Sequence, residues 1–208
     1  MANIKLITIL AIGAAFAAGV YFYPLMPDLM ASHWGMDGQA NGYTSKGWAL
    51  FLMPVITLAV VLLLTVLPKF DPMRENYRGF KKQYDQFIAA FAAFMIYVYA
   101  LTILWNKGVG FDMMPAMAPA FAGLFYYLGY LMENTKQNWF VGIRTPWTIS
   151  SKTSWDKTHK LAAKIFKIFG IASLLAILVG GRYFLFLIAG LLIATLWLVV
   201  YSYWEYKK

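Results

Sequence analysis

The stretch WALFLMPVITLAVVLLLTVL, residues 48–67, decides the fold class, because it runs for about twenty residues without a charged side chain. A helix of that length rises about 30 Å, which matches the hydrocarbon core of a bilayer. Lipid offers no hydrogen-bond partner to the backbone, so a segment in that environment satisfies its own amides by forming a helix. The stretch therefore predicts a transmembrane helix.

Five further apolar runs of similar length flank this stretch, and none alternates in polarity as the strands of a membrane barrel do. Apolar residues make up 61% of the chain and charged residues 13%, against about 25% charged residues in a soluble domain. We therefore predict an all-α polytopic membrane protein. Its six expected transmembrane helices lie at residues 6–23, 48–67, 87–105, 113–132, 161–180 and 183–204.

The first run also resembles a signal peptide, because the alanine-rich stretch AAFAA, residues 14–18, follows Lys5 at a spacing that suits a cleavage site. However, its apolar stretch continues through Tyr23. That is longer than the apolar core of a signal peptide, which has about 7–15 residues. We expect a helix that is retained.

Charge is divided unequally between alternate linkers. Fifteen of the 18 Lys and Arg residues fall on one side of the predicted membrane, and only Lys46, Lys107 and Arg182 fall on the other. The nine acidic residues divide six and three, so the net charge of +9 belongs to one side. Because Lys and Arg are retained in the cytoplasm, the split predicts a plasma-membrane protein with cytoplasmic N- and C-termini. Topology and contact with the lipid bilayer thus explain the basic excess, and no direct binding of nucleic acid is expected.

The centres of the predicted helices contain no Asp, Glu, Lys, Arg or His. Pumps and many ion-coupled transporters place such groups there, so a proton-coupled carrier is disfavoured. The chain has no cysteine, which excludes disulfides and thiolate metal sites. We expect no enzyme activity, no metal and no cofactor. A small membrane transporter or a membrane-embedded enzyme is the alternative, since broken helices also bind ions through backbone carbonyls.

Two polar linkers carry the remaining sequence signals. In residues 24–46, on the side with few basic residues, the pairs Asp37-Gly38 and Asn41-Gly42 favour turns, which predicts a compact loop or short hairpin. His33 and Asp37 lack metal-ligand spacing, so a hydrogen bond from His33 that fixes the loop is expected instead.

The second polar linker, residues 138–160, lies on the basic side. Thr153 and Asp156 fit a capping box, which predicts a short amphipathic helix leading into the fifth membrane helix. On that helix Trp155 and His159 would share a face, and Asp156 would pair with Lys160. A catalytic pair of His159 and Asp156 lacks an evident nucleophile, so a structural role is favoured.

These two linkers carry a resemblance to the SdpI family. Its N-terminal domain of unknown function resembles the pattern formed by Pro24, Pro27, His33-Trp34, Gly38, Gly42-Tyr43 and Ser45-Lys46. Its C-terminal signature is similar to residues 138–148, NWFVGIRTPWT, together with Trp155 and Thr158-His159. The resemblance covers nearly the whole chain. It implies an N-terminal part at residues 1–83 and an SdpI-like part at residues 84–208.

The resemblance also implies a function. SdpI proteins are membrane immunity factors that protect toxin-secreting bacteria from their own sporulation-delaying-protein toxin, and the type member holds a cognate repressor at the membrane. A peptide toxin and a soluble repressor are therefore the expected partners. The toxin-binding candidates in the first polar linker are Pro24, Pro27, His33, Trp34, Gly38, Tyr43 and Lys46. The candidates for docking the repressor are Asn138, Gly142, Arg144, Thr145, Pro146, Trp147, Trp155 and His159.

Overall fold

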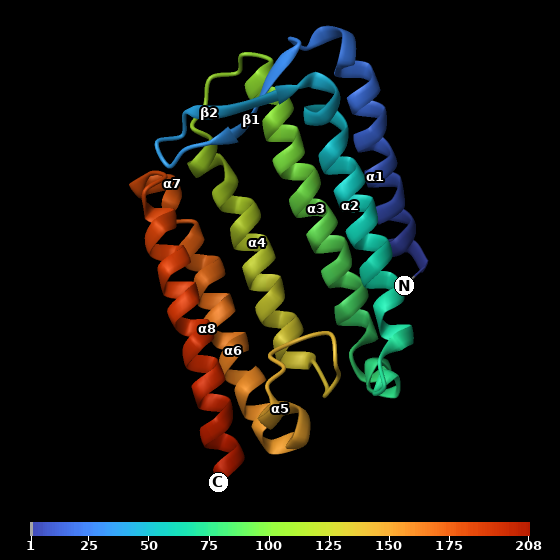
Figure 1. Ribbon diagram of the computed structural model, residues 1–208, viewed down its shortest axis with the longest axis vertical. Helices are drawn as coiled ribbons and strands as arrows, with labels where there is room; N and C mark the ends of the chain where they lie inside the picture. Colours follow the sequence, from blue (N-terminus) through green and yellow to red (C-terminus); the bar gives the residue numbers. More distant parts are fainter. Residues whose placement is uncertain (1) are drawn as a thin grey trace.

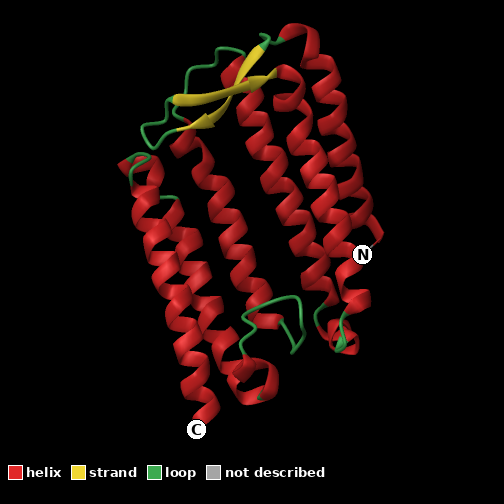
Figure 2. Cartoon of the chain, viewed as in Figure 1, coloured by secondary structure: helices red, strands yellow, loops and turns green. Residues whose placement is uncertain are grey.

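The computed structural model describes residues 2–208. Its long helices are α1 (Ala2–Phe22), α2 (Lys46–Val66), α3 (Lys81–Asn106), α4 (Met113–Asn134), α6 (Lys152–Ser173) and α8 (Tyr183–Lys207). The short helices are η1 (Tyr23–Leu25), η2 (Leu67–Phe70), η3 (Arg74–Gly79), α5 (Pro146–Ser150) and α7 (Ala176–Val179). Strands β1 (Leu29–Trp34) and β2 (Ala40–Ser45) form one antiparallel hairpin. The all-α prediction is confirmed, and the hairpin is the one expected as an option in the first polar linker (Figure 2).

Five segments are long and apolar enough to cross a membrane. They comprise α1 with η1, α2 with η2, α3, α6 with α7, and α8. Helix α4 has 22 residues, which is long enough, but two prolines and three tyrosines make its composition less apolar. The prediction that α4 crosses the membrane therefore depends on how this helix packs rather than on its composition.

The long helices form two groups of three, one made of α1, α2 and α3 and the other of α4, α6 and α8 (Figure 1). Contact between α3 and α4 joins the groups. Helices α4 and α6 pack closely along each other, because a glycine stands at two of their contacts. A Cβ on Gly129 would lie 2.7 Å from the Ala163 carbonyl oxygen, and one on Gly170 would lie 2.7 Å from the Tyr126 nitrogen. Helix α4 thus lies against a candidate span through much of its length.

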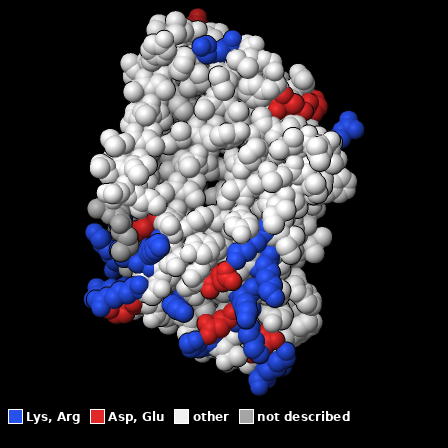
Figure 3. Space-filling view, turned by 180° about the vertical axis from the view of Figure 1, so that it is seen from behind, with Lys and Arg blue, Asp and Glu red and all other residues white. Residues whose placement is uncertain are grey.

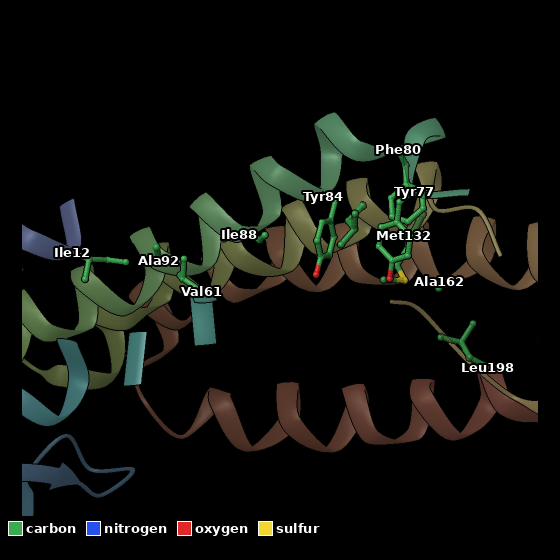
Figure 4. Packing of buried hydrophobic residues seen from close by; sticks show 12 residues of the cluster. Ile12, Val61, Tyr77, Phe80, Tyr84, Ile88, Ala92, Met132, Ala162 and Leu198 are labelled. Carbon is green, nitrogen blue, oxygen red and sulfur yellow. The ribbon is translucent and has the colours of Figure 1, made fainter. Parts of the chain in front are cut away.

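The largest buried cluster lies where the two groups meet (Figure 4). Phe80, Tyr77 and Tyr84 pack ring against ring at one end of it, with centroids 4.9–6.4 Å apart. Leu131 and Ala162, from the second group, belong to the same cluster and are fully buried. The predicted boundary at residue 83 falls in the first turn of α3, which packs with α1 and α2, and a division of function at that point stays a prediction.

The helix expected at residues 161–180 differs from the prediction at both of its ends, because α6 begins at Lys152 and ends at Ser173. Helix α6 begins at Lys152, where Ser151 is the N-cap and accepts a hydrogen bond from the Ser154 amide, so the capping box of Thr153 was wrong. Asp156 pairs with Lys152 in the first turn rather than with Lys160. The separate amphipathic helix predicted there is instead the first part of α6.

One turn signal was also wrong. Gly38 adopts a positive φ of 76° in the hairpin turn, as Asp37-Gly38 predicts. Gly42 instead lies within β2 opposite His33, and a Cβ on it would lie 2.9 Å from the His33 Cβ. The glycine is therefore needed for close approach of the two strands rather than for a turn.

Candidate functional site

Charge separates the two ends of the helix bundle. Lys and Arg side chains gather toward one end, which we call the basic end, and few lie at the other (Figure 3). The opposite end, which we call the hairpin end, carries β1, β2 and the α3–α4 loop (Figure 1). Each polar linker highlighted by the sequence lies at one of these ends, so the molecule has two candidate sites.

The hairpin is closed at its base by an ion pair. The Lys46 Nζ lies 2.9 Å from an Asp28 carboxylate oxygen and 5.0 Å from the centre of the Tyr23 ring. The Lys46 amide also donates to the Asp28 carbonyl at 3.0 Å. The hydrogen bond from Lys46 holds the pKa of the exposed Asp28 carboxyl below its usual value. These contacts connect the start of α2 to the start of the hairpin.

The middle of the hairpin is anchored to α3. The Asn106 side chain accepts a hydrogen bond from the Ala31 amide at 2.8 Å and donates to the Ala31 carbonyl at 3.0 Å. Ala31 is fully buried, and the neighbouring Trp34 packs edge to face on Trp105 at 5.7 Å. A single side chain thus satisfies both backbone groups of one strand residue, which fixes the strand on the helix end.

The tip of the hairpin reaches the second helix group. A Cβ on Gly38 would overlap the carboxylate of Asp112, the N-cap residue of α4. At the turn before α8, a Cβ on Gly181 would lie 2.5 Å from the Met36 carbonyl oxygen. The hairpin therefore spans the bundle end from α2 and α3 to α4 and α8.

An open groove lies between the hairpin and the α3–α4 loop, with a volume of about 600 Å³. We call it the hairpin groove. It is lined by Pro27, Leu29, Gly38, Gln39, Tyr43, Trp105, Asn106, Gly108, Val109, Gly110 and Phe111. Leu29, Tyr43 and Val109 expose 66%, 60% and 48% of their surface, so the groove presents an apolar surface at a polar end of the molecule.

Three of the predicted toxin-binding residues, Pro27, Gly38 and Tyr43, line this groove. The others serve the hairpin itself: Pro24 lies in η1, Lys46 closes the base, and Trp34 packs on Trp105. The His33 Nδ1 lies 2.5 Å from the side-chain amide oxygen Oδ1 of Asn41, which confirms the expected loop-fixing hydrogen bond. Sequence reasoning missed Leu29 of the hairpin. It also missed residues 108–111, because nothing local indicates that the α3–α4 loop lies beside the hairpin.

At the basic end, the second polar linker is organised around Asn138, which is fully buried. Its amide nitrogen donates to two carbonyls, of Lys136 and Val141, at 2.8 and 2.9 Å. Its oxygen accepts from the amides of Phe140 and Val141 and from the Tyr77 hydroxyl. Burial raises the pKa of Tyr77, so this hydroxyl keeps the proton that it donates.

Asp71 joins this linker to the α2–α3 linker. It is 2% exposed, and its two oxygens accept from the Met73 amide at 2.7 Å and from the Trp139 amide at 2.8 Å. Asn76 reinforces the junction by donating to the Gln137 carbonyl at 2.7 Å. Asp71 was absent from the sequence candidates. The only sequence signal for it was an acidic residue next to Pro72 in a basic linker.

His159 holds the bend of the same linker. Its Nε2 accepts from the Ile143 amide at 3.0 Å, so Nδ1 carries the proton and donates to the Trp155 carbonyl at 2.8 Å. The imidazole stacks on the Trp155 ring at 3.9 Å, which confirms their shared face. Gly142 has a φ of 110° and packs directly on this imidazole. Both ring nitrogens are engaged, so neither is free for acid–base chemistry or a metal.

Hydroxyl groups connect α5, α6 and α8. Thr145 caps α5 in a capping box with Thr148, and its hydroxyl lies 3.0 Å from that of Ser202. The Ser154 hydroxyl donates to the Ser202 carbonyl at 2.7 Å. All four residues are buried. The conspicuous polar sequence of this linker therefore satisfies backbone groups that would otherwise be unpaired.

The predicted docking residues divide by exposure. Asn138, Thr145, Trp155 and His159 are buried, and Trp155 also donates from its indole to the Thr135 carbonyl at 3.1 Å. Gly142 is partly exposed and packs on His159. Arg144 and Pro146 are exposed, and Arg144 donates to the Trp139 carbonyl. Trp147 is partly exposed and packs on Tyr203. Only Arg144, Pro146 and Trp147 can therefore touch a soluble partner directly.

Among residues 2–208, no group of three or more His, Cys, Asp and Glu side chains gathers as a metal site would.

Comparison with known proteins finds a match for each polar linker. Residues 134–202 match the model of the SdpI/YfhL protein family, and residues 10–58 match a domain of unknown function, DUF1648. The chain is 26% identical to the immunity protein SdpI of Bacillus subtilis (strain 168), over 98% of this chain and 96% of the relative. No solved structure matches the chain significantly.

The apolar helices, the anchored hairpin and the packed basic linker define a multi-pass membrane protein. The family-model match and the near full-length likeness make the comparison specific: this chain is similar to proteins of the SdpI family. The resemblance seen in the sequence is thereby confirmed. This family of immunity proteins is not an enzyme family.

Proposed function

We propose that this protein is an immunity factor that binds a secreted, membrane-active peptide toxin in the hairpin groove. The observation that carries the proposal is the exposed apolar lining of that groove, formed by Leu29, Tyr43 and Val109. An amphipathic peptide buries its apolar side chains in such a groove and is thereby kept out of the bilayer. The relative's name, immunity protein SdpI, supports the same assignment.

The proposal includes an orientation. With six crossings, α4 among them, the chain places both termini and the basic end in the cytoplasm and the hairpin groove outside. The gathering of Lys and Arg at the basic end supports this orientation (Figure 3). The packing of α4 against α6 supports the sixth crossing, because a 22-residue helix rises about 33 Å. The mechanism is binding without covalent chemistry, so no cofactor and no catalytic residue is involved.

Survival of a toxin-sensitive strain tests this function. Expression of the wild-type protein is expected to restore growth in the family's sporulation-delaying-protein toxin, and a Leu29→Asp/Tyr43→Asp variant is expected to lose that protection. Each apolar side chain that is buried by a ligand contributes about 1.5–3 kcal/mol, so toxin binding should weaken at least roughly tenfold. Growth at equal toxin concentration and equal membrane expression is the measurement.

A Met36→Asp variant is the matched control, because Met36 is 46% exposed at the hairpin tip but does not line the groove. It should protect as the wild type does. Protection by the double variant, or no protection by the wild-type protein, would refute toxin binding in this groove.

A second function, docking of a soluble repressor, is favoured by one observation at the basic end. Arg144 and Trp139 are exposed beside each other on a linker whose buried side is fixed by Asn138 and His159. A rigid surface with an exposed arginine and tryptophan has the composition of an interface centre.

Membrane recruitment of a DNA-binding partner should be lost in the Arg144→Ala variant, while survival in the toxin should be kept. Recruitment unchanged by Arg144→Ala would exclude this surface.

A further inference from the structure

A polar pocket of about 280 Å³ lies at the basic end, between the last turn of α4 and the first three turns of α6. Its walls contain two lysines, Lys136 and Lys160, and two acids, Glu133 and Asp156. Neither the toxin groove nor the exposed face of Arg144 includes it. It is a strongly charged cavity that the proposed function leaves unused.

The two acids of this pocket are already neutralised. Glu133 lies 2.5 Å from the Lys167 Nζ, and Asp156 pairs with Lys152. In contrast, Lys136 and Lys160 have no carboxylate within ion-pair distance among residues 2–208. The pocket and its bordering ion pairs therefore keep two uncompensated positive charges, which favours an anionic ligand.

The position of the pocket indicates where that anion comes from. Lys160, Lys164 and Lys167 follow at i, i+4 and i+7, so they lie on one face of α6 and cover about 10 Å of its length. Helix α6 is a candidate membrane span, and the pocket lies at its first turns. This is the level at which a span enters the layer of phospholipid headgroups, and basic pockets there hold acidic headgroups.

Packing fixes the walls of the pocket in place. The stem of Lys136 packs on Gly79 of η3, since a Cβ there would lie 3.3 Å from the Lys136 Cγ. The wall behind Lys160 is formed by the buried His159, whose two nitrogens are held by the Ile143 amide and the Trp155 carbonyl. The lysines thus extend from a rigid wall rather than from a loose loop.

We propose that this pocket binds the phosphate of an anionic phospholipid headgroup, held by Lys136 and Lys160. The acyl chains lie along the apolar surface beside α6, where Ile168 and Ile171 expose 63% and 62% of their surface. The site is distinct from the toxin groove, which lies at the opposite end of the bundle (Figure 1).

The test measures lipid binding to the purified full-length protein by native mass spectrometry, with phosphatidylglycerol and phosphatidylcholine compared. The wild type should prefer phosphatidylglycerol, and Lys136→Ala/Lys160→Ala should reduce that preference roughly 10- to 30-fold, since each interfacial lysine contributes about 1 kcal/mol. A Lys69→Ala/Lys207→Ala variant removes the same charge at the basic end and should keep the preference. Lys136→Arg/Lys160→Arg should restore it, which separates loss of charge from loss of fold.

Two results would overturn the proposal. One is an equal loss of preference in both alanine double variants, which would indicate general attraction to the basic end. The other is displacement of the bound lipid by inorganic phosphate at equal concentration, which would assign the pocket to a free phosphate. Survival in the toxin is measured on the same variants, and it should not change, so failure here is distinguishable from failure of the toxin-binding function.

Discussion

Replacing Gly142 by alanine is expected to destabilise the folded protein by about 2–5 kcal/mol. The left-handed conformation costs a non-glycine residue about 1–2 kcal/mol, and loss of a buried hydrogen-bond partner costs a further 1–3 kcal/mol. Both penalties apply here, because Gly142 has a φ of 110° and its Cβ would displace the His159 imidazole from the Ile143 amide. The midpoint of thermal unfolding in detergent is the measurement.

Two other glycines separate these contributions. Gly108 has a φ of 85° with open space around a Cβ, so Gly108→Ala should show the conformational cost alone, about 1–2 kcal/mol. Gly123 lies within α4, again in open space, and Gly123→Ala should be neutral or slightly stabilising. A Gly142→Ala variant as stable as Gly108→Ala would show that the His159 contact carries no energy.

Replacing Asn138 by alanine should destabilise the protein by about 2–4 kcal/mol, since several buried polar groups lose their partner at once. The groups left unpaired include the Tyr77 hydroxyl and the carbonyl of Lys136. Loss of the basic linker's fold should also expose the Asp71 junction, so proteolysis between residues 135 and 151 should accelerate. Unfolding midpoints and limited proteolysis in detergent measure the two effects.

Asn76→Ala is the matched control, because Asn76 is an exposed asparagine of the same region with one hydrogen bond, to the Gln137 carbonyl. Its expected cost is within about 1 kcal/mol. Equal effects of the two alanine variants would contradict the central place given to Asn138.

Hydropathy predicted the positions of the long helices well because a segment in lipid must satisfy its backbone internally, and that requirement is local in sequence. The ends of α6 were less predictable. Ser150, Ser151 and Thr153 all suit an N-cap, and only the backbone geometry selects Ser151. Helix α4 shows the reverse difficulty, because its tyrosines and prolines lower its hydropathy while its packing against α6 uses glycines that a composition window ignores.

The contacts made by the candidate site residues could not be predicted from the sequence, for a different physical reason. Single residues of both linkers were named from their sequence pattern, but their partners lie far away along the chain. Asp71 meets the Trp139 amide across 68 residues, and Asn106 meets Ala31 across 75. Nothing local in either segment specifies such a contact. The buried hydrogen-bonding role of Asn138 and His159 therefore emerged only from the fold, although both had been named as surface candidates.

The central claim is that the hairpin groove faces outward and binds the toxin, and cysteine labelling in intact cells tests it most directly. The chain has no cysteine, so single Gln39→Cys and Thr153→Cys variants can be labelled without background. A membrane-impermeant maleimide should modify the Gln39→Cys variant in intact cells, more slowly when toxin is present, and the Thr153→Cys variant only after permeabilisation. The reverse pattern of access, or a labelling rate for Gln39→Cys that toxin leaves unchanged in protected cells, would contradict the claim.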